Sequence, residues 1–130
     1  MKYLYIDGDN IGLRIEQSFL NNDEHSLVLI NKNVSNLVNQ ISEYLIENNQ
    51  EIIFSGADGI ISKGLNIDIP KIIDYIRLLE SDLTFSIGAG SSLKDSYIAL
   101  RYAKSISKNI GVEYINNEFS IIEGKITNGK

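Results

Sequence analysis

The apolar residues of the chain fall into short runs, and the spacing within each run predicts an alternation of strands and helices. The runs at residues 2–6 and 52–54 are rich in aromatic and β-branched residues, which is typical of buried strands. Residues 11–20 have helical character, and the apolar positions of residues 33–47 follow a helical period. The polar residues 21–26 between these two helices predict a connection.

The middle of the chain predicts a hairpin followed by a helix. Residues 55–58 (Ser-Gly-Ala-Asp) are typical of a turn, and the apolar run at residues 59–61 starts a new strand. Asp68 can cap the next helix, with Pro70 in its first turn. We therefore expect a strand, a turn, a second strand and a helix, in that order.

The last part of the chain predicts a strand, a helix and a second hairpin. The apolar strand at residues 83–87 is expected to end in the glycine-rich segment 88–90. Ser92 and Asp95 then resemble a capping box that opens the helix. Two further apolar runs flank the paired asparagines at residues 116–117, which suits a terminal hairpin.

The order of these elements predicts an α+β fold. It matches the βαββαβ order of a ferredoxin-like domain, in which the third strand inserts between the first two. We therefore expect an antiparallel sheet with helices packed on one face, an extra C-terminal hairpin, and a single domain over residues 1–130. The carboxyl ends of the first two strands then lie at the same rim of the sheet.

Acidic and basic residues are expected to meet at this rim. Asp7 and Asp9 follow the first strand, and Asp58 lies on the hairpin turn. Lys104 and Lys108 lie late on the last helix, which returns toward the rim. Mg²⁺ takes oxygen ligands together with substrate phosphates, and lysine suits a triphosphate. The pattern therefore predicts a site for a metal-bound polyphosphate.

Each of these residues also has an ordinary structural interpretation. Asp7 and Asp9 can cap the helix that follows them, and Asp58 suits a plain hairpin turn. Lys104 and Lys108 can be favourable charges near a helix C-terminus. The shared rim of the carboxylates favours the metal site over this alternative.

Composition and charge bear against several other classes of protein. The chain of 130 residues has no cysteine, which excludes disulfides, thiolate zinc sites and a cysteine nucleophile. Its one histidine, His25, lies in a polar stretch. The net charge of −5 argues against a stable DNA or RNA complex, because such proteins are usually basic on one face. The apolar runs are too short to span a bilayer, so we expect a cytoplasmic protein without a membrane partner.

Three segments together resemble a known family. They are YIDGDNIG (residues 5–12), IIFSGADGII (52–61) and FSIGAGSSLKDSYIALRYAKSISKN (85–109). The last is similar to the segment after the signature hairpin of GGDEF-type nucleotidyl cyclases, and the middle one occupies the place of their Gly-Gly-Asp/Glu hairpin. In so short a chain the combination resembles the minimal CRISPR polymerase (mCpol) group, which is related to the palm domain of the type III CRISPR polymerase subunit.

The resemblance implies a palm-type polymerase or cyclase that joins nucleoside triphosphates, with ATP as the expected substrate. Its product would be a cyclic oligonucleotide, such as a cyclic dinucleotide, that a separate effector protein reads in antiviral defence. It also implies Mg²⁺ or Mn²⁺ as cofactor. Because cyclising two nucleotides needs two such sites, a two-fold homodimer is expected.

The resemblance also assigns roles by position. Asp7 and Asp58 correspond to the catalytic metal carboxylates, and the carbonyl of Gly8 corresponds to a further metal ligand. The candidate substrate contacts are Asp9, Asn10, Ser55, Gly56, Lys104 and Lys108, with Lys104 at the position of a phosphate-binding lysine.

The hairpin departs from the cyclase pattern at two positions. Ser55 replaces the first glycine, and Ala57 replaces an acidic residue, so the hairpin carries one carboxylate rather than two. Either Asp9 completes the set, or metal binding is weaker, or the chain is inactive. The usual regulatory partner domains are also absent, so control would come from another chain or from the product.

Two rival interpretations follow from the same residues. A ribonuclease of the NYN/PIN type also opens with an apolar strand that ends in Asp-Gly-x-Asn, but it needs a parallel, doubly wound sheet. A catalytically inactive palm that binds nucleotide as a sensor would explain the missing carboxylate at Ala57.

Overall fold

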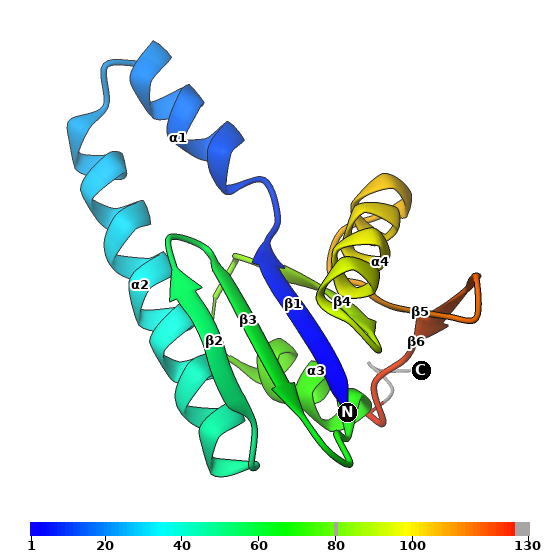
Figure 1. Cartoon of the computed structure of the whole chain (residues 1–130). Coiled ribbons are helices and arrows are strands. Elements are labelled where there is room, and N and C mark those ends of the chain that lie inside the picture. Colours follow the sequence, from blue (N-terminus) through cyan, green and yellow to red (C-terminus); the bar gives the residue numbers. More distant parts are fainter. Residues whose placement is uncertain (80, 127–130) are drawn as a thin grey trace.

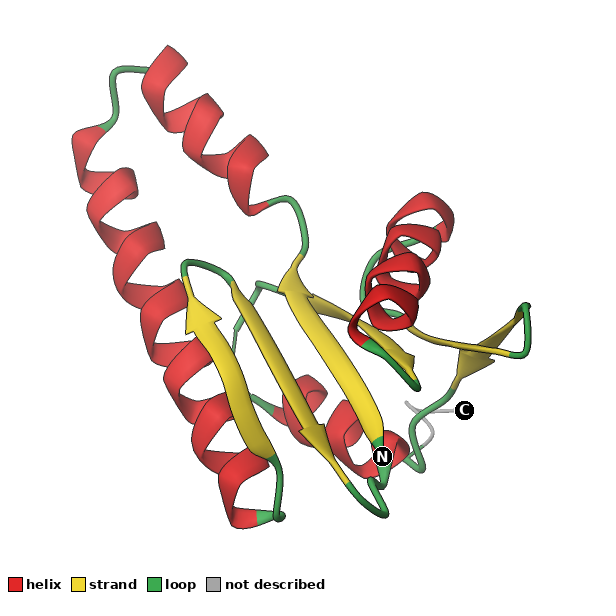
Figure 2. Ribbon diagram, in the orientation of Figure 1, coloured by secondary structure: helices red, strands yellow, loops and turns green. Residues whose placement is uncertain are grey.

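The structure is a computed structural model that describes residues 1–79 and 81–126. It contains one six-stranded sheet in the order β2-β3-β1-β4-β5-β6, with helices on both faces (Figures 1 and 2). The elements are β1 (Lys2–Gly8), α1 (Ile11–Leu20), α2 (Glu24–Glu47), β2 (Glu51–Gly56), β3 (Gly59–Gly64), α3 (Ile69–Leu78), β4 (Phe85–Gly90), α4 (Leu93–Ile106), β5 (Gly111–Ile115) and β6 (Glu118–Ile122). Within the described residues, no helix is long and apolar enough to cross a membrane.

The middle of the sheet has the predicted ferredoxin-like arrangement. β1 pairs antiparallel with β3 and β4, and β3 also pairs antiparallel with β2, so β3 lies between the first two strands. The predicted α+β fold is therefore confirmed. β5 pairs with β4 in parallel, and the expected hairpin joins it to β6 through Asn116 and Asn117, which both have positive φ. A two-residue type I′ turn requires this conformation.

Two helices cover one face of the sheet, and α4 covers the other (Figure 1). α2 and α3 bury most of the apolar core against β1, β3 and β4, where Ile6 and Ile87 are typical members. A smaller cluster of Ala99, Ala103 and Val112 lies between α4 and β5. The expectation that the helices share one face therefore describes α2 and α3 but not α4.

α4 can pack on the second face because β4 presents glycine there. Ile87 belongs to the core under α2 and α3, whereas its neighbour Gly88 lies against α4. A Cβ on Gly88 would lie 2.3 Å from Leu100 N and 2.4 Å from Ser96 O. The segment 88–90 therefore continues β4 and receives the helix, rather than ending the strand as predicted.

α2 begins earlier than the sequence predicts. Its first residue is Glu24, because Asp23 Oδ1 accepts a hydrogen bond from Ser26 N at 3.0 Å and caps the helix. Residues 24–26 therefore form the first turn of α2 rather than a connection, and His25 is exposed there. α1 and α2 project beyond the sheet as a helical hairpin (Figure 1).

α4 begins as predicted but ends earlier. Ser92 Oγ accepts a hydrogen bond from Asp95 N at 3.1 Å, which caps the start of the helix. The last helical residue is Ile106, so Lys108 lies in the segment that leads to β5 and not on the helix. Lys104, in the last turn, remains the helical lysine of the predicted pair.

Asp9 ties the end of β1 to β4 and to the segment before β5. The residue is 5% exposed. Its Oδ1 accepts hydrogen bonds from Ser86 Oγ at 2.8 Å and Lys104 Nζ at 2.9 Å. Its Oδ2 accepts from Thr84 Oγ1 at 2.7 Å and Asn109 N at 2.8 Å. Burial alone would raise the pKa of Asp9, but these hydrogen bonds to its charged form lower the pKa below the ordinary value.

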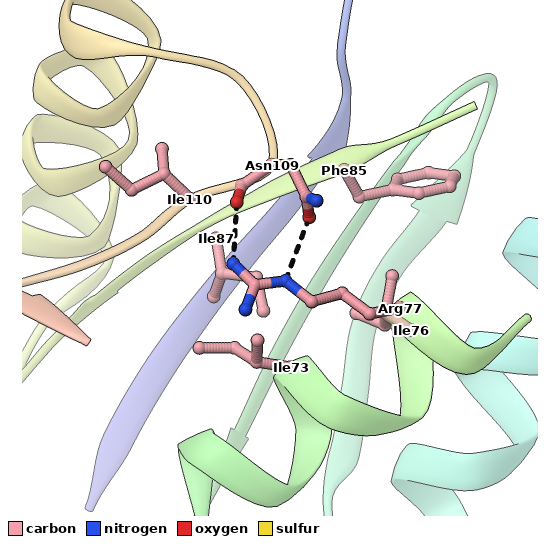
Figure 3. Close-up of a pocket in the computed structure, with 7 residues that line it drawn as sticks. All are labelled: Ile73, Ile76, Arg77, Phe85, Ile87, Asn109 and Ile110. Atoms are coloured by element: carbon pink, nitrogen blue, oxygen red, sulfur yellow. Dashed lines mark hydrogen bonds between the residues drawn. The ribbon is translucent and has the colours of Figure 1, made fainter. Parts of the chain in front are cut away.

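Asn109 is held from the α3 side by Arg77. Figure 3 shows the Arg77 side chain extending from α3 to Asn109, past Ile73 and Ile76. Arg77 Nε donates to Asn109 Oδ1 at 3.2 Å, and Arg77 Nη2 donates to Asn109 O at 2.7 Å. Asp9 and Arg77 therefore fix the same residue through its N–H and both of its oxygens, and this fixes the segment that follows α4.

Gly88→Ala should destabilise the fold strongly. The new Cβ would meet the backbone of α4, which cannot rotate away, so we expect the free energy of unfolding to fall by about 3 kcal/mol. Gly12→Ala is the matched control, because a Cβ there has no neighbour within 4 Å and alanine favours the helix. Urea unfolding checks both variants, and equal stabilities would contradict the packing of α4 described here.

Asp9→Asn should cost about 3 kcal/mol at pH 7, because Lys104 would lose a buried charged partner. The folded pKa of Asp9 lies below the unfolded value of about 3.9. Its stabilisation is therefore complete above that value and is lost as the pH falls through the folded pKa. Urea unfolding from pH 7 down to the acid range should show wild type and variant converging. Asp82→Asn, at an exposed ion pair with Arg14, should change stability by less than about 1 kcal/mol.

Candidate active site

Asp7 and Asp58, which are distant in sequence, line one open cavity at the end of β1. The volume of this cavity is about 340 Å³. Its lining residues are Tyr5, Asp7, Gly8, Asn10, Ile11, Gly12, Asp58, Tyr97, Leu100, Arg101 and Lys104. The cavity lies at the rim of the sheet where the sequence predicts that acidic and basic residues meet, and we call it the carboxylate cavity.

The register of β1 and β3 brings the two carboxylates to the same place. Asp7 pairs with Gly59, and Gly8 N donates a hydrogen bond to Asp58 O at 3.0 Å. Gly59 keeps the space beside Asp7 open, since a Cβ there would lie 3.2 Å from Asp7 Oδ1. Ala57 turns the hairpin with a φ of 50°, so Asp58 follows directly beside the end of β1.

The charge of Asp58 acts on Asp7 across the carboxylate cavity. Burial raises the pKa of Asp7 above its ordinary value, the charge of Asp58 raises it further, and Lys104 lowers it. Burial and the charges of Asp7 and Asp58 also raise the pKa of Tyr5. Because neighbouring carboxylate charge contributes to both shifts, a cation bound beside Asp7 and Asp58 would be stabilised.

Lys104 is surrounded by oxygen atoms from the end of β1. Its Nζ donates hydrogen bonds to Gly8 O and Asp9 Oδ1, both at 2.9 Å, and to Asp7 O at 3.3 Å. It also lies 3.3 Å from Asp7 Oδ2. The end of β1 therefore presents a set of carboxylate and carbonyl oxygens that already binds one positive charge.

The donors of the carboxylate cavity suit Mg²⁺ or Mn²⁺. Asp7 and Asp58 supply carboxylates, and the Gly8 carbonyl keeps a second lone pair beside the one that Lys104 uses. In residues 1–79 and 81–126, no three acidic, histidine or cysteine side chains gather closely enough to hold a metal by themselves. Mg²⁺ commonly uses one or two carboxylates together with substrate phosphates and waters. The residues therefore fit a metal whose coordination a polyphosphate completes.

The remaining predicted contacts are divided by the structure. Asn10 lines the carboxylate cavity. The predicted contacts that do not line it are Asp9, Ser55, Gly56 and Lys108. Both Asp9 oxygens are used by donors of the protein itself, so Asp9 does not face the cavity as a third carboxylate. Ser55 faces α2, where its Oγ lies 3.2 Å from Ser42 Oγ.

Sequence reasoning missed Tyr5, Tyr97 and Arg101, which also line the carboxylate cavity. Tyr5 precedes Asp7 by two residues in β1, so both side chains lie on the same face of the sheet. Tyr97 and Arg101 lie on the same side of α4 as Lys104, since Tyr97 precedes Arg101 by four residues and Arg101 precedes Lys104 by three. These spacings would have identified all three residues once Asp7 and Lys104 were placed at the site.

A second cavity of about 570 Å³ adjoins the carboxylate cavity. Its walls are mostly apolar side chains of α1 and α2, with Asn31 and Ser35 among the polar ones. Ile11, Gly12 and Asp58 line both cavities, so the two are neighbours on either side of these residues.

Solved structures share the fold of this chain. A diguanylate cyclase/phosphodiesterase from Caldicellulosiruptor saccharolyticus is 16% identical, with a TM-score of 0.59 over 92% of this chain and 78% of that chain. The monomeric guanylyl cyclase domain of the RhoGC fusion protein from the aquatic fungus Blastocladiella emersonii is 9% identical, with a TM-score of 0.56 over 87% and 79%. At such identities the likeness shows the fold alone.

Among curated proteins, none matches this chain. The fold and the carboxylates at the end of β1 agree with the family whose sequence pattern this chain matches. Residues 3–114 match the minimal CRISPR polymerase domain, and the chain therefore belongs to the mCpol family.

Proposed function

We propose that this protein is a metal-dependent nucleotidyltransferase that converts nucleoside triphosphates into a cyclic oligonucleotide, in the simplest case a cyclic dinucleotide. The observation that carries the proposal is the meeting of Asp7 and Asp58 in one cavity beside Lys104. Membership of a family of CRISPR polymerase domains supports a role in antiviral signalling, with a separate effector protein as reader of the product.

The proposed reaction is an in-line displacement at phosphorus. A ribose hydroxyl oxygen of one nucleotide forms a bond to the α-phosphorus of another and loses its proton to solvent water. The bond from that phosphorus to the bridging oxygen breaks, and pyrophosphate leaves. A bound Mg²⁺ or Mn²⁺ supplies positive charge beside the phosphate oxygens. Asp7 and Asp58 would hold this cation. Lys104 fixes the end of β1 by donating hydrogen bonds to the carbonyls of Asp7 and Gly8. The protein acts mainly by positioning.

The second cavity offers a place for the base of the substrate. It begins at Asp58, so a nucleotide with its phosphates in the carboxylate cavity can extend its base between α1 and α2. The Asn31 amide can both donate and accept hydrogen bonds, as the recognition of adenine requires. We therefore propose ATP as the substrate.

A two-fold homodimer is the simplest assembly for the proposed product. Closing a ring of two nucleotides requires each hydroxyl to reach the α-phosphorus of the other nucleotide. One chain has one carboxylate cavity, so two chains with facing cavities would supply both reacting centres.

An inactive, nucleotide-binding palm is the second candidate. Ala57 leaves the hairpin with one carboxylate, and Asp9 is engaged inside the protein, so the carboxylate cavity has two acidic residues. The ribonuclease alternative has less support, because β1 has antiparallel neighbours on both sides and the sheet is not doubly wound.

Incubation with each nucleoside triphosphate and Mg²⁺ or Mn²⁺ tests the proposal. We expect pyrophosphate and a cyclic product, detected by mass spectrometry, and a loss of at least about a hundredfold in rate for Asp7→Ala and Asp58→Ala. Asp82→Asn, in an exposed pair with Arg14 outside the cavity lining, is the control. Saturable nucleotide binding without turnover would favour the sensor, and RNA cleavage without triphosphate consumption would favour the nuclease.

A further inference from the structure

One side of α4 forms a wall of the carboxylate cavity. Tyr97, Arg101 and Lys104 follow one another along this side, so the cavity has two cationic residues in its lining, Arg101 and Lys104. The two cations differ in their surroundings. Arg101 is exposed, whereas Lys104 is partly buried among oxygen atoms of β1.

The side chain of Lys104 is already bound by groups of the protein itself. Its ammonium group makes hydrogen bonds to Gly8 O and Asp9 Oδ1, both at 2.9 Å. Asp9 is itself held by donors of β4 and by Asn109 N, and Arg77 holds Asn109 from α3 (Figure 3). Moving Lys104 onto a phosphate would leave the buried charge of Asp9 without its cation, which is costly.

The side chain of Arg101 is not held in this way. Within the part of the chain that the structure describes, its side chain makes no hydrogen bond or ion pair. A guanidinium group presents a planar fork of donors that matches two phosphate oxygens at once. An exposed arginine in the lining of a cavity that holds Asp7 and Asp58 is therefore free to bind an anion there.

We propose that Arg101 is the residue that binds the polyphosphate tail of the nucleotide, while Lys104 positions the end of β1. This inference rests on the proposed use of nucleoside triphosphates. It reassigns the role expected for Lys104 and Lys108 in the sequence, since Lys108 lies beyond the end of α4 and outside the cavity lining. The phosphates would lie between Arg101 and the metal at Asp7 and Asp58.

Calorimetric titration in Mg²⁺ tests this assignment with three probes: α,β-methylene ATP, inorganic tripolyphosphate and adenosine. Arg101→Gln should weaken binding of the two phosphate-bearing probes at least about tenfold and leave adenosine unchanged. Arg101→Lys keeps the positive charge but loses the planar fork of donors, so its affinity for the phosphate-bearing probes should lie between those of wild type and Arg101→Gln. Lys94→Gln is the matched control, because it removes a positive charge from an exposed position of the same helix outside the cavity.

Thermal unfolding separates the two cations. Arg101→Gln should leave the melting temperature unchanged, whereas Lys104→Gln should lower it because Asp9 loses its partner. Equal polyphosphate affinity in wild type and Arg101→Gln would overturn the proposal, as would a larger loss in Lys108→Gln than in Arg101→Gln. Wild-type protein that binds neither phosphate-bearing probe would overturn it as well.

Product formation distinguishes this inference from the proposed function. If the protein binds polyphosphate through Arg101 but forms no cyclic product, the inferred binding site stands and the proposed synthase activity is refuted. If Arg101→Gln forms the cyclic product with an unchanged KM, the proposed activity stands and the role of Arg101 in phosphate binding is refuted.

Discussion

The ion pair between Lys104 and Asp9 joins the elements from which the candidate site is built. Asp9 continues β1, Lys104 belongs to the last turn of α4, and the same carboxylate binds β4 through Thr84 and Ser86. Because the pair is largely withdrawn from water, each charge stays there only while the other is present. The position of Asp7, two residues before Asp9, follows from this arrangement.

Much of the fold could be predicted from the sequence because its signals are local. The hairpin that carries Asp58 is encoded by its own turn residues, and the apolar period defines most of the helices. This was enough to place Asp7 and Asp58 at one rim. The inward direction of Asp9 was not predictable, because its donors at Thr84 and Ser86 lie far along the chain. Arg101 was missed, although its spacing of three residues from Lys104 puts both on one side of α4.

The hairpin of this chain has Ala57 where the cyclase pattern has an acidic residue. Ala57 takes the left-handed conformation that the turn needs, and it puts no carboxylate where the cyclase pattern has one. The mCpol chain therefore shares the palm architecture of the diguanylate and guanylyl cyclases, and its hairpin carries one acidic side chain, Asp58. In the proposed reaction, the oxygen atoms of a polyphosphate would take the place of the missing ligand, so metal binding would depend on substrate binding.

The glycine face of β4 has a consequence for how this domain can change shape. The backbone of α4 rests directly on Gly88, and Asp95 in the first turn of α4 lies against Gly90. This close packing restricts sliding of α4 against β4. The opposite wall, made of α1 and α2 side chains, has no such restriction. Under the proposed function, adaptation to a different base would therefore accumulate in the projecting helices, while the wall that carries Arg101 would stay fixed.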